Sequence, residues 1–302
     1  MKQDYSFSRY LAAKKSVDDR ALNRHVWDMM VRALPIATAA TPLRMLEVGA
    51  GIGTMLERLW QSGLLVHADY TAIDAEPANV EVAEEQLGYL RQQVTFNLEA
   101  IDLFDFVERE RGRQTWDLLI AHAFLDLMNV PATLPFLFSL LPPGGLFYFT
   151  INFDGATILQ PAIDPAFDDL IEALYHRTMD ERVTAGRPSG DSHSGRHLFH
   201  QLRQAGAQVL AAGSSDWVVW AGPDGYPAEE AYFLHFIVET IHQALQGHPD
   251  LDARRFDAWI GQRHAQIEQG ELVYVAHQLD FLGRTPLSGQ PTHFRGRSRA
   301  GR

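Results

Sequence analysis

Apolar residues return along this chain with two alternating periods. Short apolar runs typical of strands alternate with segments in which apolar residues recur at helical spacing. The runs predict strands over residues 44–48, 70–74, 94–98, 117–121 and 145–152, with helices over 54–61, 77–91, 104–109 and 131–140. Such alternation predicts a parallel sheet with helices on both faces. Ligands of these sheets bind beyond the carboxyl ends of the strands, where the strand order reverses.

The pattern differs before the first strand and after residue 152. Residues 9–34 share an approximate apolar face and predict one helix. The later segments predict helices over 165–177, 196–205, 228–245 and 252–269, a polar stretch over 185–195, a strand pair or one bent strand over 208–221, and a final strand over 271–282. The last two helices interrupt a hairpin of strands, so an inserted cap over the ligand crevice is expected.

These elements predict a doubly wound, mostly parallel, seven-stranded α/β sheet with helices on both faces, an N-terminal helix and a helical cap between the last two strands. The expected divisions are an N-terminal helical segment (1–42), the α/β core (43–222), the cap (223–270), the final core strand (271–286) and a disordered basic tail (287–302). Arginine interleaved with small residues is typical of a disordered end, and the tail carries Arg295, Arg297, Arg299 and Arg302.

Composition narrows the class of protein. The 302 residues are 46% hydrophobic and 21% charged, and no apolar run is long enough to cross a bilayer. The first five residues lack the apolar centre of a secretion signal, so we expect a cytoplasmic protein without a membrane partner. The absence of cysteine excludes disulfides, thiolate metal sites and a cysteine nucleophile. The net charge of -12 repels phosphate backbones, which favours a small-molecule substrate over long nucleic acid.

A glycine-rich turn carries the strongest chemical signal. The stretch 46–54, Leu-Glu-Val-Gly-Ala-Gly-Ile-Gly-Thr, places three alternate glycines where a strand turns into a helix. Gly49, Gly51 and Gly53 permit positive φ and close approach of a ligand, and the helix presents free N–H groups. A cofactor bearing a nucleoside is therefore expected. A nicotinamide cofactor is the rival, although its loop usually has glycine or alanine where Thr54 stands and has no use for Glu47.

Carboxylates follow each of the first strands. Asp74 ends the second strand and can accept both hydroxyls of a ribose, while Asp102 follows the third strand and can accept from an adenine amine, with Leu103 against the ring. Glu47 can hold the turn or meet an ammonium group. Three carboxylates around one ligand suit a cofactor with a cationic centre and an amino-acid tail better than a pyrophosphate.

Over residues 43–152 the sequence resembles the class I S-adenosylmethionine-dependent methyltransferases, whose core is Rossmann-like and whose first motif is an acid followed by Gly-x-Gly-x-Gly. Glu47 to Gly53 matches this motif at each defining position. The resemblance implies S-adenosylmethionine as the cofactor. The binding residues it implies are Glu47, Gly49, Ala50, Gly51, Gly53, Asp74, Ala75, Asp102, Leu103 and His122.

Three features qualify the resemblance. Glu47 and Asp74 are 27 positions apart (74 minus 47), more than in many members, and a loop over 63–69 can absorb the excess. The fourth strand ends in Ala121-His122-Ala123-Phe124 and not in the Asn or Asp, Pro, Pro, aromatic motif of amino-group methylation of DNA bases, so that reaction is disfavoured. No acid set of the magnesium-dependent catechol type stands out, and no metal is predicted.

Candidate catalytic residues are His122, as a general base or a packing wall, and Asp126, as its partner or a helix cap. Candidate substrate residues are Tyr10, Lys14, Asn152, His193, Arg196 and Trp217. Solvated charge is the favoured interpretation of Lys14 and of the pair Asp18-Asp19, and a core position is favoured for Trp217.

The residues together predict a methyltransferase that moves a methyl group by in-line displacement to an oxygen or nitrogen of a small or medium-sized acceptor. An NAD(P)-dependent oxidoreductase and a non-catalytic protein of the same fold remain the alternatives. Neither the acceptor nor the oligomeric state follows from the sequence.

Overall fold

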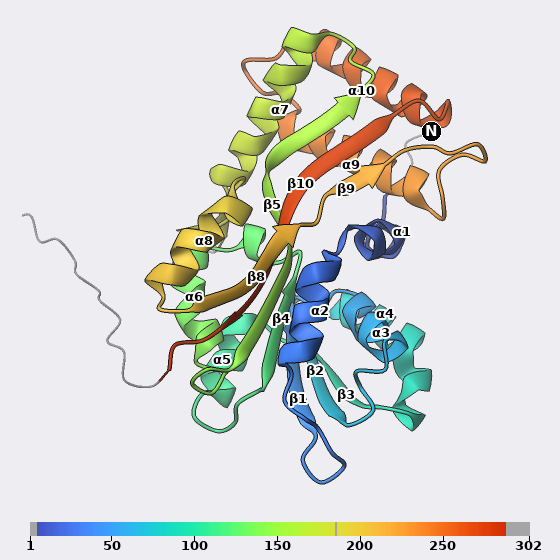
Figure 1. Cartoon of the computed structure of the whole chain (residues 1–302). Helices are drawn as coiled ribbons and strands as arrows, with labels where there is room; N and C mark the ends of the chain where they lie inside the picture. The colour runs from blue at the N-terminus through green and yellow to red at the C-terminus, as the bar shows by residue number, and fades with distance from the viewer. Residues whose placement is uncertain (1–4, 185, 288–302) are drawn as a thin grey trace, which may run out of the picture.

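The chain is described by a computed structural model over residues 5–184 and 186–287. Of the basic tail predicted over 287–302, residues 288–302 lie outside this description. An eight-stranded mixed sheet runs through the molecule (Figure 1). Its strands are β1 (Leu43–Val48), β2 (Ala68–Asp74), β3 (Thr95–Ala100), β4 (Leu118–His122), β5 (Leu146–Gln160), β8 (Gln208–Ser214), β9 (Trp217–Val219) and β10 (Val273–Arg284).

The strand order is β3-β2-β1-β4-β5-β10-β8, with β3, β2, β1, β4 and β5 mutually parallel and β10 antiparallel to both of its neighbours. The predicted α/β class with a mostly parallel sheet is confirmed, but the sheet has eight strands where the sequence predicted seven, because β9 also pairs with β10. The stretch expected as a strand pair or one bent strand is a pair, because the chain leaves β10 at residues 215–216 and β9 then pairs with β10 again. The order reverses between β1 and β4, so the expected ligand crevice lies at their carboxyl ends.

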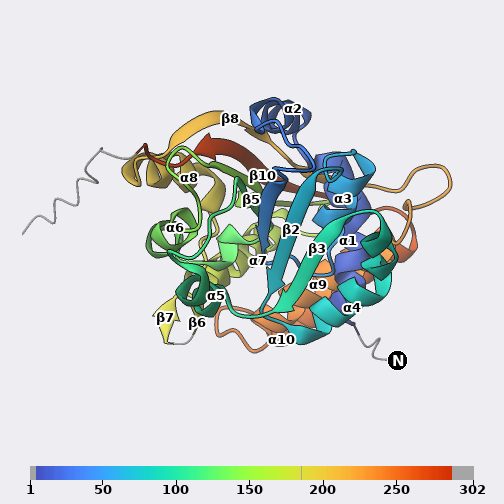
Figure 2. The ribbon, with the colours of Figure 1, turned by 90° about the horizontal axis from the view of Figure 1, so that it is seen from below.

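Helices cover both faces of the parallel part (Figure 2). Along β1, Leu43 and Met45 face one apolar cluster while Leu46 and Val48 face another, as the two-residue period of a strand buried on both sides requires. The first cluster includes side chains from α2 (Arg24–Ala33), α3 (Thr54–Gln61) and α4 (Pro77–Leu87). The second includes side chains from α5 (Leu103–Glu110), α6 (Val130–Phe138) and α8 (Ser194–Gln204).

The N-terminal segment forms two helices where the sequence predicted one. Helix α1 (Phe7–Ala21) ends before Asn23, and α2 begins after it. The Asn23 side chain caps α2 by accepting from the N–H of Val26 (3.0 Å), and the Asn23 N–H donates to the buried carboxylate of Asp280 (2.8 Å). The prediction of a continuous helix is wrong because these contacts stabilise a break that the apolar spacing alone does not reveal.

Strands β5 and β10 continue beyond the parallel sheet into a second, helical lobe (Figure 1). A third apolar cluster there joins both strands to α7 (Pro165–Asp180), α9 (Glu230–Leu245) and α10 (Ala253–Glu268), and α1 packs onto it through Ala13 and Val17. The expected helices between the last two strands are thus present, and β5 runs past the predicted end at residue 152 to Gln160. The remaining short elements are η1 (Gly88–Gln92), η2 (Leu125–Leu127), β6 (Val183–Thr184) and β7 (Arg187–Pro188). None of the described helices is both long and apolar enough to span a bilayer.

Candidate cofactor and acceptor site

A cavity of about 540 Å³ lies where β1, β2, β3 and β4 end, and α1 forms its roof. This volume is in the range of small-molecule sites. The sequence-predicted residues that the structure brings together along its wall are Tyr10, Lys14, Gly49, Ala50, Gly51, Asp74, Ala75, Asp102, Leu103, His122, Asp126 and Trp217.

The glycine turn forms the floor of the cavity. Gly49 and Gly51 have φ of 67° and 54°, the left-handed region that side chains other than glycine rarely adopt. A Cβ on Gly49 would lie 2.3 Å from the ring of Phe124, and one on Gly51 would lie 3.2 Å from Leu11 of α1. Gly53 begins α3 just behind the turn and faces Leu87, away from the cavity.

Asp74 and Asp102 line the part of the cavity in which the resemblance to methyltransferases implies that adenosine binds. Asp74 Oδ2 accepts the N–H of Gly51 (2.8 Å), and Oδ1 accepts from the N–H of Glu76 (2.9 Å) and from Asn79 Nδ2 (3.1 Å). Asp102 Oδ1 accepts the N–H of Phe104 (2.7 Å). Since each carboxylate oxygen accepts two hydrogen bonds, Oδ2 of both residues can accept at least one more. The residues present therefore fit the hydroxyl and amine donors of an adenosine.

Glu47 lies beneath the turn and does not line the cavity. It is 1% exposed and accepts the Tyr70 hydroxyl at 2.6 Å. Burial raises the pKa of the Glu47 carboxyl to about 8, although the Tyr70 hydrogen bond and the charge of Arg58 oppose the rise. Glu47 therefore makes no contact with the cavity, and its side chain is bound to Tyr70 of β2; its predicted role in holding the turn stays a prediction.

We expect Glu47→Gln to change how stability depends on pH. The folded-state pKa lies above the ordinary 4.5, so the stability contribution is complete below that value and is lost as the pH rises through about 8. The glutamine variant lacks this loss and gains on the order of 2 kcal/mol relative to wild type at alkaline pH. Urea unfolding of both proteins across this range measures it. If the free energies of unfolding of the two proteins change with pH in the same way, Glu47 is already ionised in the folded protein at neutral pH.

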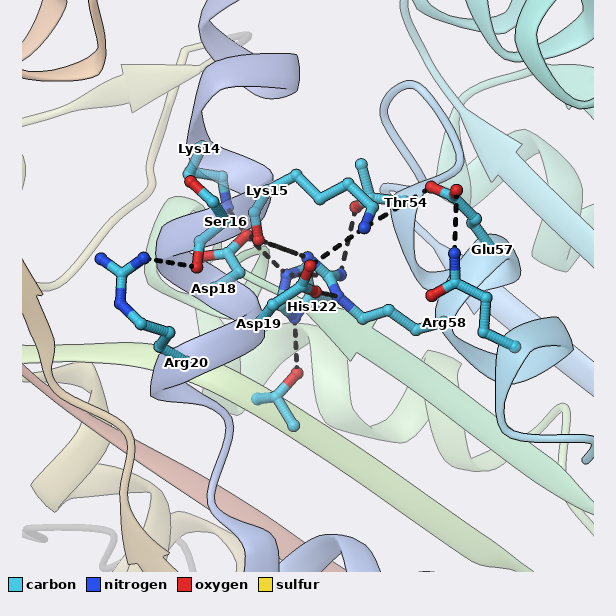
Figure 3. Close-up of polar contacts among 12 residues, drawn as sticks. Lys14, Lys15, Ser16, Asp18, Asp19, Arg20, Thr54, Glu57, Arg58 and His122 are labelled. Carbon is cyan, nitrogen blue, oxygen red and sulfur yellow. Dashed lines mark hydrogen bonds and ion pairs between the residues drawn. The ribbon is translucent and has the colours of Figure 1, made fainter. Parts of the chain in front are cut away.

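His122 belongs to a buried polar network that anchors α1 (Figure 3). Its Nε2 lies 3.0 Å from Asp18 Oδ2, and its Nδ1 lies 2.8 Å from Thr150 Oγ1. The same Asp18 oxygen accepts from Lys14 Nζ (2.7 Å), and the other accepts from Trp217 Nε1 (2.8 Å). A carboxylate only accepts, so His122 donates from Nε2 and accepts the threonine hydroxyl at Nδ1.

This network makes His122 a poor proton acceptor for a substrate. Burial lowers its pKa to about 4, with Asp18 opposing the shift and Arg58 and Lys14 adding to it. The imidazole is thus neutral near pH 7, but both of its nitrogens are engaged. The interpretation of Lys14 and Asp18 as solvated charge is wrong, because both residues are buried.

Arg58 joins α3 to α1. Its Nε donates to Asp19 Oδ1 of α1 (2.5 Å), and its Nη1 contacts Thr54 Oγ1 of α3 (3.2 Å). A second ion pair joins the two helices, because Lys15 of α1 lies 3.6 Å from Glu57 of α3 (Figure 3). Two ion pairs and the Asp18 cluster therefore hold α1 over the cavity. The sequence analysis missed this role, although Phe7, Leu11, Lys14 and Asp18 follow one another at helical spacing and so share a face.

Asp126 stands on η2 beside the cavity and does not pair with His122. Burial raises the pKa of its carboxyl, against the charges of Arg182 and Lys14. Its Oδ1 is enclosed by protein and has no hydrogen-bond partner among the described residues.

Three predicted substrate residues are not part of this wall. Asn152 is buried in the sheet and donates to the carbonyl of Leu279 (2.8 Å). Arg196 donates to Asp154 Oδ1 (2.8 Å). His193 precedes α8 and lies close to Asp180 and Asp191. One side-chain nitrogen or oxygen from each of these three residues lies within 4.8 Å of the other two. Lining residues that the sequence analysis did not name include Phe7, Leu11, Asn79, Phe124 and Met128.

The segment that contains the glycine turn, Asp74 and Asp102 matches a known family. Residues 46–147 match the family model described as "Methyltransferase domain". No curated protein matched the chain. The fold is similar to the [4+2]-cyclase SpnF (15% identity, TM-score 0.45, 93% of this chain and 94% of that chain) and to the cyclopropane synthase MmaA2 from Mycobacterium tuberculosis (10%, 0.46, 93% and 99%). It is also similar to a putative sarcosine dimethylglycine methyltransferase from Galdieria sulphuraria (13%, 0.41, 92% and 85%).

Proposed function

We propose that this chain, whose residues 46–147 form a class I S-adenosylmethionine-dependent methyltransferase domain, methylates an oxygen or nitrogen of a small or medium-sized acceptor. The cofactor and the enzyme class follow from the domain. The acceptor and the roles of individual residues are the proposal.

The observation that supports it is one continuous cavity. The glycine turn, Asp74 and Asp102 line one part of it, and Asp126 and Trp217 line the same space. S-Adenosylmethionine, when bound, supplies a methyl group on a positively charged sulfur. Asp74 would hold the ribose and Asp102 the adenine amine, while Leu103 packs against the ring.

The protein's contribution to rate is then orientation and exclusion of water. Helix α1 lines one side of the cavity, and its ion pairs to α3 hold it in that position. The volume of about 540 Å³ must hold cofactor and acceptor together, which favours a small acceptor. Long nucleic acid is disfavoured by the net charge of -12. The cytoplasmic location expected from the sequence stays a prediction.

A transfer assay tests the proposal. The purified protein is incubated with S-adenosylmethionine labelled in the methyl group and a panel of small alcohols, phenols, carboxylates and amines. We expect S-adenosylhomocysteine and labelled product in equal amounts, formed only when a suitable acceptor is present. Binding of S-adenosylhomocysteine without transfer to any acceptor would favour the non-catalytic alternative, and binding of NADH or NADPH in its place would favour the oxidoreductase.

A further inference from the structure

We propose that the acceptor is a primary or secondary amine held against Asp126, which accepts its proton. This inference rests on the proposed function and adds the chemical class of the acceptor. It is carried by the position of Asp126, the pairing of the cations on the cavity wall, and Tyr10, which lines the same cavity as the carboxylate.

The backbone fixes Asp126 at the cavity. Ala123, directly after β4, has a φ of 50°, which turns the chain sharply into η2. Leu125 is buried in the sheet's apolar cluster, and the Asp126 carbonyl accepts the N–H of Asp191 (3.3 Å). A non-glycine residue in the left-handed region costs free energy and is often found at functional sites. The turn therefore holds one carboxylate at the cavity wall.

The Asp126 carboxylate has no side-chain partner within the described residues, although its own backbone N–H acts on it. Its Oδ1 is enclosed and accepts no hydrogen bond, and no described cation lies within ion-pair distance of it. Lys14 of α1 and Arg182 act on it only from farther away. An unpaired carboxylate in such a place is costly unless a ligand supplies a donor.

The basic side chains of the described cavity wall and of the α1 anchor are already paired or neutral. Lys14 is bound to Asp18 at 2.7 Å, Arg58 is bound to Asp19 at 2.5 Å, and His122 is neutral. An acceptor that develops negative charge, such as a phenolate or a carboxylate, would face Asp126 with no unpaired cation among the described lining residues. An acceptor that develops positive charge gains from the same arrangement.

Methylation of an amine has this requirement. An ammonium N–H bond breaks, and its proton passes to Asp126 and from there to water, which leaves Asp126 ionised beside a neutral amine. The electron pair of nitrogen then forms the bond to the methyl carbon, and the bond from carbon to sulfur breaks with its electron pair left on sulfur, which gives S-adenosylhomocysteine and a methylated ammonium. Positive charge grows on nitrogen in the transition state, so the ionised carboxylate beside it lowers the barrier.

Tyr10 of α1 lines the same cavity as Asp126. The charge of Asp126 contributes to the raised pKa of Tyr10 and of Tyr175 in α7. Burial is the main cause for both residues and raises the pKa of Tyr175 to about 12, so both are neutral phenols at physiological pH. Aromatic rings and phenol oxygens suit a cation.

Matched pairs of acceptors test the inference. Benzylamine is compared with benzyl alcohol, and phenethylamine with phenethyl alcohol, in wild type, Asp126→Asn and the control Asp105→Asn, which removes an exposed carboxylate of α5. We expect methylation of the amines only. Asp126→Asn should lower kcat/KM for the amine by about 100-fold or more, while its S-adenosylhomocysteine affinity stays within about twofold of wild type. The control should match wild type in both measurements.

Two further measurements do not depend on turnover by the variant. Wild-type kcat/KM should fall as the pH drops through the raised pKa of Asp126, and any residual activity of Asp126→Asn should lack this limb. Titration of benzylamine into the S-adenosylhomocysteine complex should show binding that Asp126→Asn weakens by about tenfold or more. Thermal unfolding of the variant checks that it is folded.

The outcomes separate the inference from the proposed function. Methylation of the alcohols and not the amines would overturn the amine assignment and leave the proposed function intact. Equal kcat/KM for the amine in wild type and Asp126→Asn would overturn the role of Asp126. If neither class is methylated although S-adenosylhomocysteine binds, the proposed function fails. The titration of benzylamine then tests the amine site by itself. Binding to wild type that is lost in Asp126→Asn supports the amine site, and absence of binding to wild type overturns it.

Discussion

Asp18→Ala is expected to lower the free energy of unfolding by about 3 to 5 kcal/mol. The carboxylate is 1% exposed and is the shared acceptor of Lys14, His122 and Trp217. Its removal leaves the buried ammonium of Lys14 without a partner, and that uncompensated charge dominates the cost. Urea unfolding of wild type and variant at neutral pH measures the change.

The pH dependence of the same site has a defined sign. Burial alone would raise the pKa of Asp18, but the charge of Lys14, the interaction with His122, including its hydrogen bond, and the charge of Arg58 outweigh it and lower the pKa. The stability from Asp18 is therefore present above the ordinary carboxyl pKa and is lost as the pH falls below it. The control is Asp19→Ala, since Asp19 bonds Arg58 with 38% of its side chain exposed, and it should cost about 1 kcal/mol or less. Equal costs for the two variants would show that the buried network does not anchor α1.

Gly49→Ala is expected to lower stability by about 2 to 5 kcal/mol and to weaken cofactor binding. Two effects add: an L-residue in the left-handed region costs about 1 to 2 kcal/mol, and the new Cβ, 2.3 Å from the ring of Phe124, must displace it at a cost of about 1 to 3 kcal/mol. The displaced ring lines the cavity beside the turn. Urea unfolding and titration with S-adenosylhomocysteine measure the two effects.

Gly63→Ala separates backbone strain from overlap. Gly63 has a φ of 75°, close to that of Gly49, but a Cβ added there would meet nothing within 4 Å. Gly63→Ala should lower stability only by the backbone cost of about 1 to 2 kcal/mol and keep the wild-type affinity for S-adenosylhomocysteine. In Gly49→Ala, a second change of Phe124 to alanine should recover part of the affinity. If Gly49→Ala behaves like Gly63→Ala, close packing of the turn against Phe124 is not what requires glycine at this position.

The parallel core could be predicted because its signals are local. Each strand of the α/β part is an apolar run bounded by turn residues, and the motif from Glu47 to Gly53 sits at one of these boundaries. The positions of Asp74 and Asp102 followed from the rule that parallel strands end at one edge. These inferences needed only the order of elements along the chain.

The buried network could not be predicted because its members are far apart in sequence. Asp18, His122 and Trp217 come from α1, β4 and β9, and a charged residue on an N-terminal helix is usually solvated. The break at Asn23 likewise depends on Asp280, 257 residues away. Arg196 was expected to contact the substrate, but its side chain donates a hydrogen bond to Asp154.

Titration calorimetry with S-adenosylhomocysteine tests the central claim, that the glycine turn with Asp74 and Asp102 binds this cofactor. Wild type and Asp69→Ala, which removes an exposed carboxylate at the opposite end of β2, should bind it equally, with no binding of NADH. Asp74→Ala should bind about 1 to 3 kcal/mol more weakly, roughly 5- to 150-fold, because hydrogen bonds to a charged group are lost. Absence of binding by wild type, binding of NADH in its place, or an unchanged affinity in Asp74→Ala would contradict the claim.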